Sequence, residues 1–230
     1  MGNTALEILK SSLGFLTTLP VRGDVDVLRR NLWIFPYIGA FLGFLIAIPE
    51  FFGFWVLCIV LYVLLEGINH IDGLSDFGDG FFAPDSKKKI AMKDTKLGAG
   101  GSTFLCVYLL VLYYSFQNVS AIEIIMAQIL AKYSMLILLV TSKPSWEGMG
   151  AYFMEFARKR DLLIGAVPLV LLFADITKVL SNLISLIIIS ALTFLLKYYA
   201  NSKLGGIGGD IIGTANCISF ASALLFFSLI

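Results

Sequence analysis

The chain has 230 residues, of which 58% are hydrophobic and only 14% are charged, whereas a soluble domain usually carries about 25% charged residues. This composition excludes an ordinary water-soluble domain and predicts an integral membrane protein. The formal net charge of +1 excludes the strongly basic surface with which proteins usually bind nucleic acid, so we expect no nucleic-acid partner.

Apolar runs of membrane-spanning length recur along the whole chain. A helix needs about 20 apolar residues to cross the hydrocarbon core of a bilayer. We predict about seven such helices, and they cover 33–49, 51–66, 103–119, 121–141, 161–179, 183–200 and 211–230. The predicted fold is therefore all-α, a polytopic membrane helix bundle in which residues 1–230 form a single domain.

The beginning of the chain shows two further patterns. The segment 1–32 contains leucines at helical spacing, which predict a helix lying on the cytoplasmic membrane surface: Leu6, Leu9, Leu13 and Leu16. The stretch 33–66 is short for two spans and long for one. Because Pro49, Glu50 and Gly53 indicate a turn within it, we predict two short, tilted spans.

The basic residues predict the orientation in the membrane. Nearly all of them lie in the segments that seven spans place on one side of the bilayer, and the exceptions are Lys132 and Lys178. Lysines and arginines concentrate in cytoplasmic loops, so we expect a multi-pass protein of the cell membrane with a cytoplasmic N-terminus. Lys87, Lys88 and Lys89 are assigned to this topological role alone.

The segment 67–102 is the most polar part of the chain. Asp72, Asp76 and Asp79 stand at i, i+4 and i+7, so on a helix they share one face. Carboxylates that close repel one another unless a hard cation binds their oxygens. The spacing predicts a Mg²⁺ site that handles pyrophosphate, and the other interpretation is a solvated acidic loop with turn glycines.

A second polar group follows just before the third predicted span. It consists of Lys93, Asp94, Lys96, Gly98, Gly100 and Gly101. Glycine-rich backbone at a helix N-terminus presents free N–H groups to an anion, which predicts phosphate binding. The other interpretation is that the lysines anchor the loop and the glycines form a hinge.

Three single residues remain. Asp210 is the one carboxylate in the glycine-rich cytoplasmic loop 201–210. Lys132 is costly to bury inside a span, so it should face a cavity, a carboxylate such as Glu123 or a substrate phosphate, unless its span is broken and the ammonium reaches the interface. His70 is the only histidine, which excludes a histidine-based metal triad. A helix places it opposite the aspartates, in a supporting role.

The order of these motifs resembles the cobalamin synthase family. Four blocks carry the resemblance: Phe15-Leu-Thr-Thr-Leu-Pro20 is similar to F-x-T-x-L-P, Asp72-Gly-Leu-Ser-Asp76-Phe-Gly-Asp79-Gly80 to D-G-L-A-D-x-x-D-G, Met92-Lys-Asp94 with Lys96-Leu-Gly98 to M-K-D-x-x-x-G, and Gly205-Gly-Ile-Gly-Gly-Asp210 to G-G-x-T-G-D. In the last block Gly208 replaces the family's threonine.

The resemblance implies a reaction in which α-ribazole, or its 5′-phosphate, attacks the cobinamide-linked phosphorus of adenosylcobinamide-GDP and GMP leaves. It implies Mg²⁺ held by Asp72, Asp76 and Asp79. It further implies that Asp210 completes the metal shell or accepts the ribazole hydroxyl proton, which makes Asp76, Asp79 and Asp210 the expected catalytic residues. Phosphate would be held by Lys93, Asp94, Lys96, Lys132 and the glycines Gly98 to Gly101.

Two other function classes fit the sequence less well. A CDP-alcohol or prenyl transferase would also use aspartates and Mg²⁺, but a second aspartate-rich motif is missing and no arginine follows Asp72-Gly73 before Arg158. An ion-coupled transporter would place its charges at the bilayer midplane, whereas the clustered aspartates here lie in a cytoplasmic loop and at its helix end. Nothing in the sequence favours a particular oligomeric state.

Overall fold

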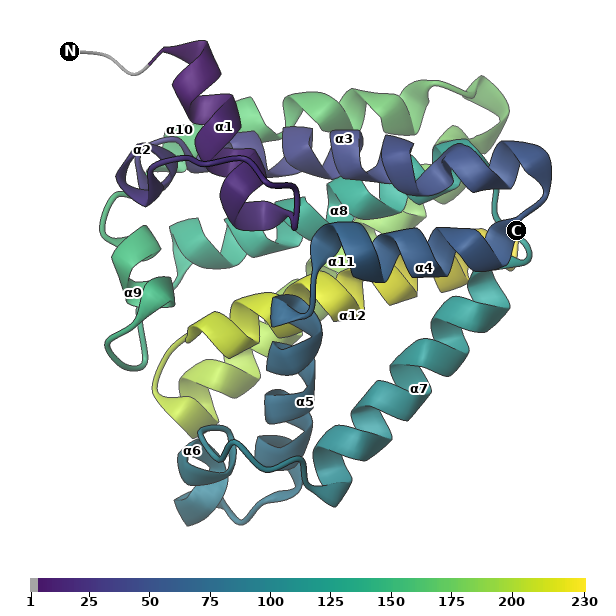
Figure 1. Ribbon diagram of the computed structural model, residues 1–230. Helices are drawn as coiled ribbons and strands as arrows, with labels where there is room; N and C mark the ends of the chain where they lie inside the picture. The colour runs from purple at the N-terminus through teal and green to yellow at the C-terminus, as the bar shows by residue number, and fades with distance from the viewer. Residues whose placement is uncertain (1–3) are drawn as a thin grey trace.

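The computed structural model describes residues 4–230 and shows a bundle of helices (Figure 1). The α-helices are α1 Ala5–Leu16, α2 Val25–Arg29, α3 Phe35–Ala47, α4 Trp55–Glu66, α5 Asn69–Phe82, α6 Lys88–Ala91, α7 Ala99–Phe116, α8 Ala121–Thr141, α9 Met149–Met154, α10 Lys159–Gly165, α11 Val179–Leu204 and α12 Gly209–Phe227. Short 3₁₀ helices cover Leu32–Ile34, Ile48–Phe52, Asp85–Lys87, Val167–Phe173 and Ile176–Lys178.

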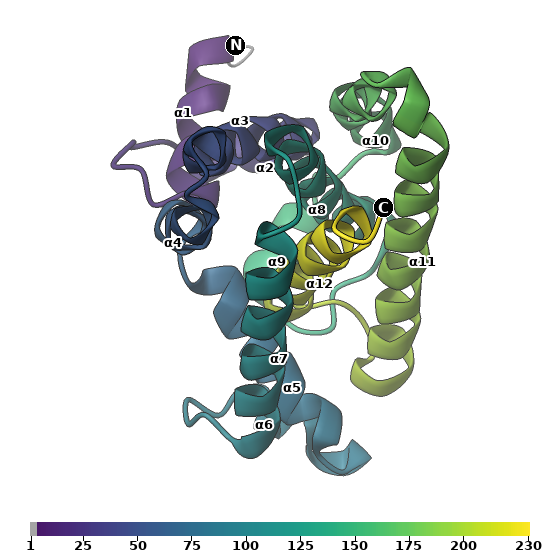
Figure 2. The same cartoon turned by 90° about the vertical axis from the view of Figure 1, so that its right-hand side faces the viewer.

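Helices α8 and α12 form the centre of the bundle. Of their most apolar 18-residue windows, 78% and 72% are buried, against 28% for α7 and α11. Figure 2 shows why α8 and α12 are more buried: α3 and α4 lie on one side of this central pair and α11 lies on the other. The exposed apolar side chains of α7 and α11 therefore form a surface that can contact lipid.

Within residues 4–230, five helical stretches are long and apolar enough to cross a membrane. They are Leu32–Phe52, Ala99–Phe116, Ala121–Thr141, Ile176–Leu204 and Gly209–Phe227. The pair α4 and α5 makes a sixth only if the two are counted as one span, because they meet at an angle of 91°. The predicted all-α membrane bundle is confirmed, and the predicted count of seven spans is not.

The helix predicted at 161–179 is the main difference. The chain there forms α10 and then the 3₁₀ helix Val167–Phe173, with Pro168 at its start. Proline has no backbone N–H and clashes with the preceding turn, which interrupts an α-helix. In Figure 1 this broken helical segment still runs alongside α3, but it contains no α-helix of membrane-spanning length.

The stretch 33–66 divides near the predicted turn, but α4, with 12 residues, is too short to be the predicted second span by itself. Helix α3 and its 3₁₀ extension end at Gly53, which has φ +74°, and α4 then runs back beside α3. Helix α4 ends at Glu66 because Gly67, with φ +76°, turns the chain sharply into α5. A side chain at Gly67 would strain this left-handed conformation.

The predicted N-terminal helix is α1. It begins with a capping box between Thr4 and Glu7, and it packs on the core through Ile8 and Leu16 while Leu6 and Leu9 stay exposed. In Figures 1 and 2 the helix runs across the direction of α3. Its contact with the membrane surface remains a prediction.

Candidate active site

The site is assembled where α5 crosses α12. Gly73 of α5 lies against the backbone of Asp210, and a Cβ atom on Gly73 would be only 2.8 Å from the Asp210 carbonyl oxygen. The Thr214 hydroxyl donates to the carbonyls of both Gly73 (3.0 Å) and Asp210 (2.7 Å). This close approach brings the aspartates of α5 next to the first turn of α12.

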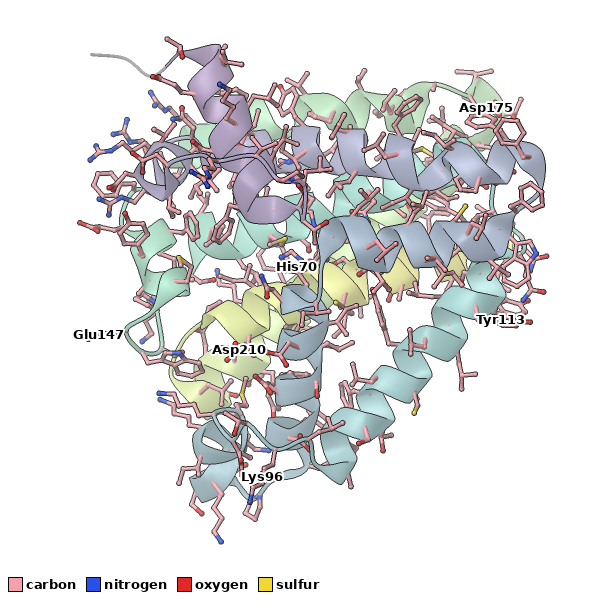
Figure 3. All side chains as sticks on the ribbon, in the orientation of Figure 1. His70, Lys96, Tyr113, Glu147, Asp175 and Asp210 are labelled. Atoms are coloured by element: carbon pink, nitrogen blue, oxygen red, sulfur yellow. The ribbon has the colours of Figure 1, made fainter. Side chains whose placement is uncertain are left out.

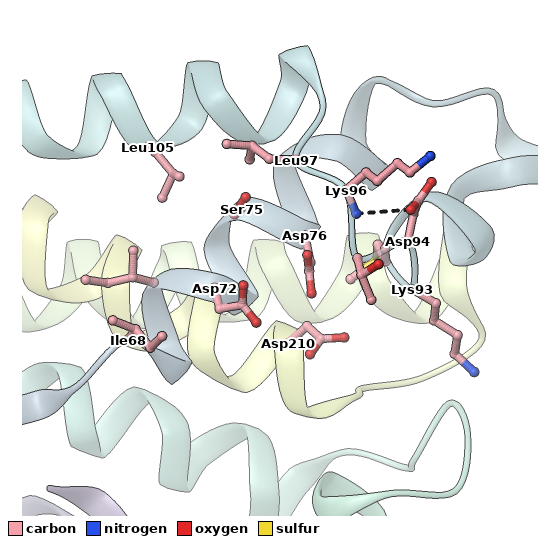
Figure 4. Close-up of a pocket in the computed structure, with 13 residues that line it drawn as sticks. Ile68, Asp72, Ser75, Asp76, Lys93, Asp94, Lys96, Leu97, Leu105 and Asp210 are labelled. Carbon is pink, nitrogen blue, oxygen red and sulfur yellow. Dashed lines mark hydrogen bonds between the residues drawn. The ribbon is translucent and has the colours of Figure 1, made fainter. Parts of the chain in front are cut away.

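Three carboxylates converge at this crossing. Figure 4 shows Asp72 and Asp76 on α5 and Asp210 on α12 pointing toward the same space. Asp76 experiences the like charges of Asp72, Asp210 and Asp79, and Asp210 experiences that of Asp72. The cluster therefore concentrates negative charge, and Lys93 is the nearby cation that acts on Asp210.

A cavity of about 580 Å³ opens at these carboxylates. We call it the first cavity, and it is lined by Ile68, Ile71, Asp72, Ser75, Asp76, Met92, Lys93, Asp94, Thr95, Lys96, Leu97, Leu105 and Asp210. Six residues singled out from the sequence thus share one cavity, although they come from three separate segments. Lys93, Asp94 and Lys96 are exposed at its edge.

Asp79 does not line the first cavity, and its carboxylate is hydrogen-bonded to backbone N–H groups instead. Its Oδ2 accepts a hydrogen bond from the Gly98 N–H (2.9 Å) and its Oδ1 accepts one from the Gly101 N–H (2.8 Å). A carboxylate at a helix N-terminus satisfies otherwise unpaired N–H groups and interacts favourably with the helix dipole. Asp79 therefore caps α7 from the neighbouring helix.

This capping changes the interpretation of the glycine run. Gly98, Gly100 and Gly101 do not line the first cavity, and two of their N–H groups are donated to Asp79 instead of a phosphate. Gly100 also packs tightly on Gly78, since a Cβ at Gly100 would lie 2.4 Å from the Gly78 carbonyl oxygen. In this structure the glycines join α7 to α5, because residues with side chains would hold the helices apart.

Lys132 is fully buried and does not reach the first cavity. Its ammonium pairs with the Glu66 carboxylate and donates to Asn216 Oδ1 (2.8 Å). Glu66 Oε1 and Oε2 also accept hydrogen bonds from Asn216 Nδ2 (2.6 Å) and Gln128 Nε2 (3.0 Å). The expectation of a phosphate or Glu123 as partner is therefore corrected: a buried ammonium needs a buried counter-charge, and Glu66 at the end of α4 provides it.

Glu123 lies in the first turn of α8 and has another partner. It pairs with Lys178 at 2.7 Å, which explains why it is not available to Lys132. The pair also fixes the start of α11 against the start of α8.

A second cavity, of about 340 Å³, adjoins the first. It is lined by Phe15, Phe35, Glu66, Asn69, His70, Asp72, Met135, Leu139, Met149, Gly150, Phe153, Gly209, Asp210, Ile212 and Gly213. Asp72 and Asp210 line both cavities. His70 lies beside this cavity with its Nδ1 3.1 Å from Oε1 of Glu66, and Figure 3 places it close to Asp210 in the middle of the molecule.

Sequence reasoning did not find Glu66 or the second cavity. Glu66 had a signal, because it is a carboxylate at the end of an apolar run and so must find a partner. The cavity had none, since its walls come from α1, α3, α4, α5, α8, α9 and α12 and only the folded chain brings them together.

The carboxylates suit a hard cation by their chemistry. Oxygen ligands from aspartate are those that Mg²⁺ accepts in proteins, with water and substrate oxygens completing its shell. Among residues 4–230, no three His, Cys, Asp or Glu side chains stand in a geometry that holds a metal by themselves. Asp72, Asp76 and Asp210 are the convergent set, and Asp79 is engaged with α7.

Comparison with known proteins gives consistent matches over nearly the whole chain. A family model described as Cobalamin-5-phosphate synthase matches residues 8–228. Two adenosylcobinamide-GDP ribazoletransferases of Archaeoglobus fulgidus are 58% identical over 221 residues (96% of this chain and 96% of that protein) and 46% identical over 223 residues (95% and 96%). One from Pyrococcus abyssi is 35% identical over 232 residues (96% and 97%). No solved structure matches the chain.

Proposed function

The chain belongs to the cobalamin-5-phosphate synthase family, and from this membership we propose that it carries out its transfer at the crossing of α5 and α12. It is an adenosylcobinamide-GDP ribazoletransferase of cobalamin biosynthesis with membrane-spanning helices. The assignment removes the CDP-alcohol, prenyl and transporter alternatives. The observation that carries the proposed location is the convergence of Asp72, Asp76 and Asp210 beside exposed lysines in one cavity.

The substrates we propose are adenosylcobinamide-GDP and α-ribazole or its 5′-phosphate. The ribazole hydroxyl oxygen forms a bond to the cobinamide-linked phosphorus, the anhydride bond of the diphosphate breaks, and GMP leaves with the bridging oxygen. The hydroxyl proton passes to a carboxylate of the cluster. The products are GMP and adenosylcobalamin, or its 5′-phosphate.

The first cavity has the charges that such a diphosphate requires. Lys93 and Lys96 at its edge attract phosphate oxygens, and Asp94 orders their loop by accepting a hydrogen bond from the Lys96 N–H at 3.0 Å. Lysine contacts of this kind neutralise charge on the transferring group. We therefore assign phosphate binding to Lys93 and Lys96, with Asp94 in support.

We propose that the carboxylates of Asp72, Asp76 and Asp210 hold Mg²⁺. Bound there, the cation would supply positive charge against the diphosphate. The position of Asp210 beside Asp72 and Asp76 supports its role in completing this set, and Asp79 would act indirectly by fixing α7 against α5.

The active site is proposed to face the cytoplasm. In Figure 3 nitrogen-bearing side chains gather at the end of the bundle near Glu147, whereas Tyr113 and Asp175 lie at the opposite end. This gathering of nitrogen-bearing side chains supports the orientation, because lysine and arginine concentrate on the cytoplasmic side.

The test is turnover by purified protein in liposomes with both substrates, with and without Mg²⁺, following GMP and the cobamide product. Asp76→Asn should abolish turnover while the protein stays folded and inserted. Asp85→Asn is the matched control, because Asp85 is an exposed carboxylate paired with Lys203 (2.7 Å) away from the cavity. Wild-type turnover by Asp76→Asn would remove Asp76 from the site.

A further inference from the structure

The two cavities meet at the same pair of carboxylates, yet their linings differ in kind. The first is edged by Lys93 and Lys96. Among the described residues that line the second, none is a lysine or an arginine. A diphosphate therefore has cations to bind in the first cavity, whereas the second offers it the like charges of Asp72 and Asp210, and Glu66 there is already paired with Lys132.

The far wall of the second cavity is aromatic and aliphatic. Phe153 of α9 makes edge-to-face contacts with Phe15 (ring centroids 4.8 Å apart) and with Phe35 (6.3 Å). Met135 and Leu139 of α8 complete this wall. Such a lining binds a flat apolar ring system through stacking and dispersion contacts.

The near wall is polar and held in place. His70 and Asn69 stand at it, and Glu66 behind them accepts hydrogen bonds from Gln128 and Asn216 in addition to the Lys132 pair. These hydrogen bonds hold Glu66 in place, whereas His70 Nδ1 is buried without a hydrogen-bond partner among residues 4–230. The wall therefore presents a fixed carboxylate and the polar groups of Asn69 and His70, which can bind hydroxyl groups of a ligand.

We propose that the second cavity is the acceptor site, which holds the ribazole with its heteroaromatic base against Phe153 and Leu139. Its ribose faces Asn69 and His70, so that a ribose hydroxyl reaches the shared carboxylates Asp72 and Asp210. The cobinamide-linked diphosphate enters from the first cavity. This assignment of one substrate to each cavity rests on the proposed function.

The test measures substrate selection within one enzyme preparation. The variant Leu139→Phe narrows the aromatic end of the second cavity, so it should disfavour ribazole, whose base carries two methyl groups, relative to the unmethylated benzimidazole riboside. The ratio of the two kcat/KM values should fall about tenfold or more, because a pocket discriminates one methylene by about 10- to 200-fold. Partial unfolding cancels in this ratio.

Lys96→Ala is the matched variant in the first cavity. It should lower kcat/KM for adenosylcobinamide-GDP and leave the ratio of the two ribosides at its wild-type value. If Leu139→Phe leaves the ratio unchanged, or if Lys96→Ala shifts it equally, the acceptor-site assignment is overturned. If wild-type protein forms no cobamide from either riboside, the proposed function itself fails.

Discussion

Asp76 and Asp79 lie one helical turn apart on α5, but their carboxylates have different surroundings. Asp76 faces the like charges of Asp72, Asp210 and Asp79. Asp79 accepts two backbone hydrogen bonds from the start of α7. The first arrangement destabilises the fold in the absence of a cation and the second stabilises it, as expected where function and stability are in conflict.

Removing each carboxylate should therefore have opposite effects on stability. Asp79→Ala should lower the free energy of unfolding by about 1–2 kcal/mol, because it leaves helix N-terminal N–H groups unpaired. Asp76→Ala should raise the thermal midpoint in Mg²⁺-free buffer, since it removes a repelling charge. Thermal unfolding followed by tryptophan fluorescence in detergent measures both, and equal destabilisation by the two changes would contradict the distinction.

At the scale of elements, α5 is held at its end by a lysine that the sequence analysis treated as a topological charge. Lys88 is buried, and its Nζ donates to the carbonyls of Gly80 (3.2 Å), Phe81 (2.8 Å) and Ala83 (2.9 Å). These are the unpaired carbonyls at the end of the helix. Lys87, by contrast, is exposed.

Lys88→Met should fray this end of α5. We expect amide hydrogen exchange in its last turn to become about tenfold faster, the effect of losing a hydrogen bond to a charged group. Lys87→Met removes the same charge from the exposed neighbour and should leave exchange unchanged. If both variants exchange alike, the capping role of Lys88 is wrong.

The crossing of α5 and α12 depends on Gly73. A methyl group there would meet the Asp210 carbonyl oxygen at 2.8 Å, and a backbone atom cannot swing aside. Gly73→Ala should lower kcat/KM about 100-fold, because small displacements of reacting groups cost this much. Gly209→Ala, where a Cβ meets nothing within 4 Å, should keep the wild-type thermal midpoint. Unchanged turnover by Gly73→Ala would show that the helices tolerate separation.

At the scale of the whole molecule, the orientation can be tested with single cysteines. In a variant lacking Cys58, Cys106 and Cys217, Glu147→Cys should react with a membrane-impermeant maleimide from the cytoplasmic side, and Gln117→Cys from the other side. Both positions are exposed, and they lie at opposite ends of the bundle. The reverse labelling pattern would invert the proposed topology.

The long helices were predictable because apolar runs are a local property of the sequence. The predicted span 121–141 coincides with α8, and 103–119 falls largely within α7. The prediction at 161–179 was wrong because hydrophobicity outweighed Pro168. The sharp bend between α4 and α5 was not predicted, because the short glycine-containing link after Glu66 does not indicate the angle between the two helices.

The site was predictable in its residues but not in its contacts. The motif spacing grouped Asp72 and Asp76, the family resemblance added Asp210, and all three line the same cavity. The partners of Asp79 and Lys132 could not be foreseen, because they depend on which distant backbone or side chain packs alongside. Gly98 and Glu66 lie far from them in sequence and become neighbours only in the folded bundle.

The two adjoining cavities also bear on stereochemistry. Because Asp72 and Asp210 line both cavities, the proposed assignment of one substrate to each cavity would allow donor and acceptor to be bound together. Under that proposal the incoming oxygen would attack phosphorus directly on the side opposite the departing nucleotide, without prior transfer of the group to an enzyme side chain. We therefore expect a single displacement to invert the configuration of a phosphorus made chiral with oxygen isotopes.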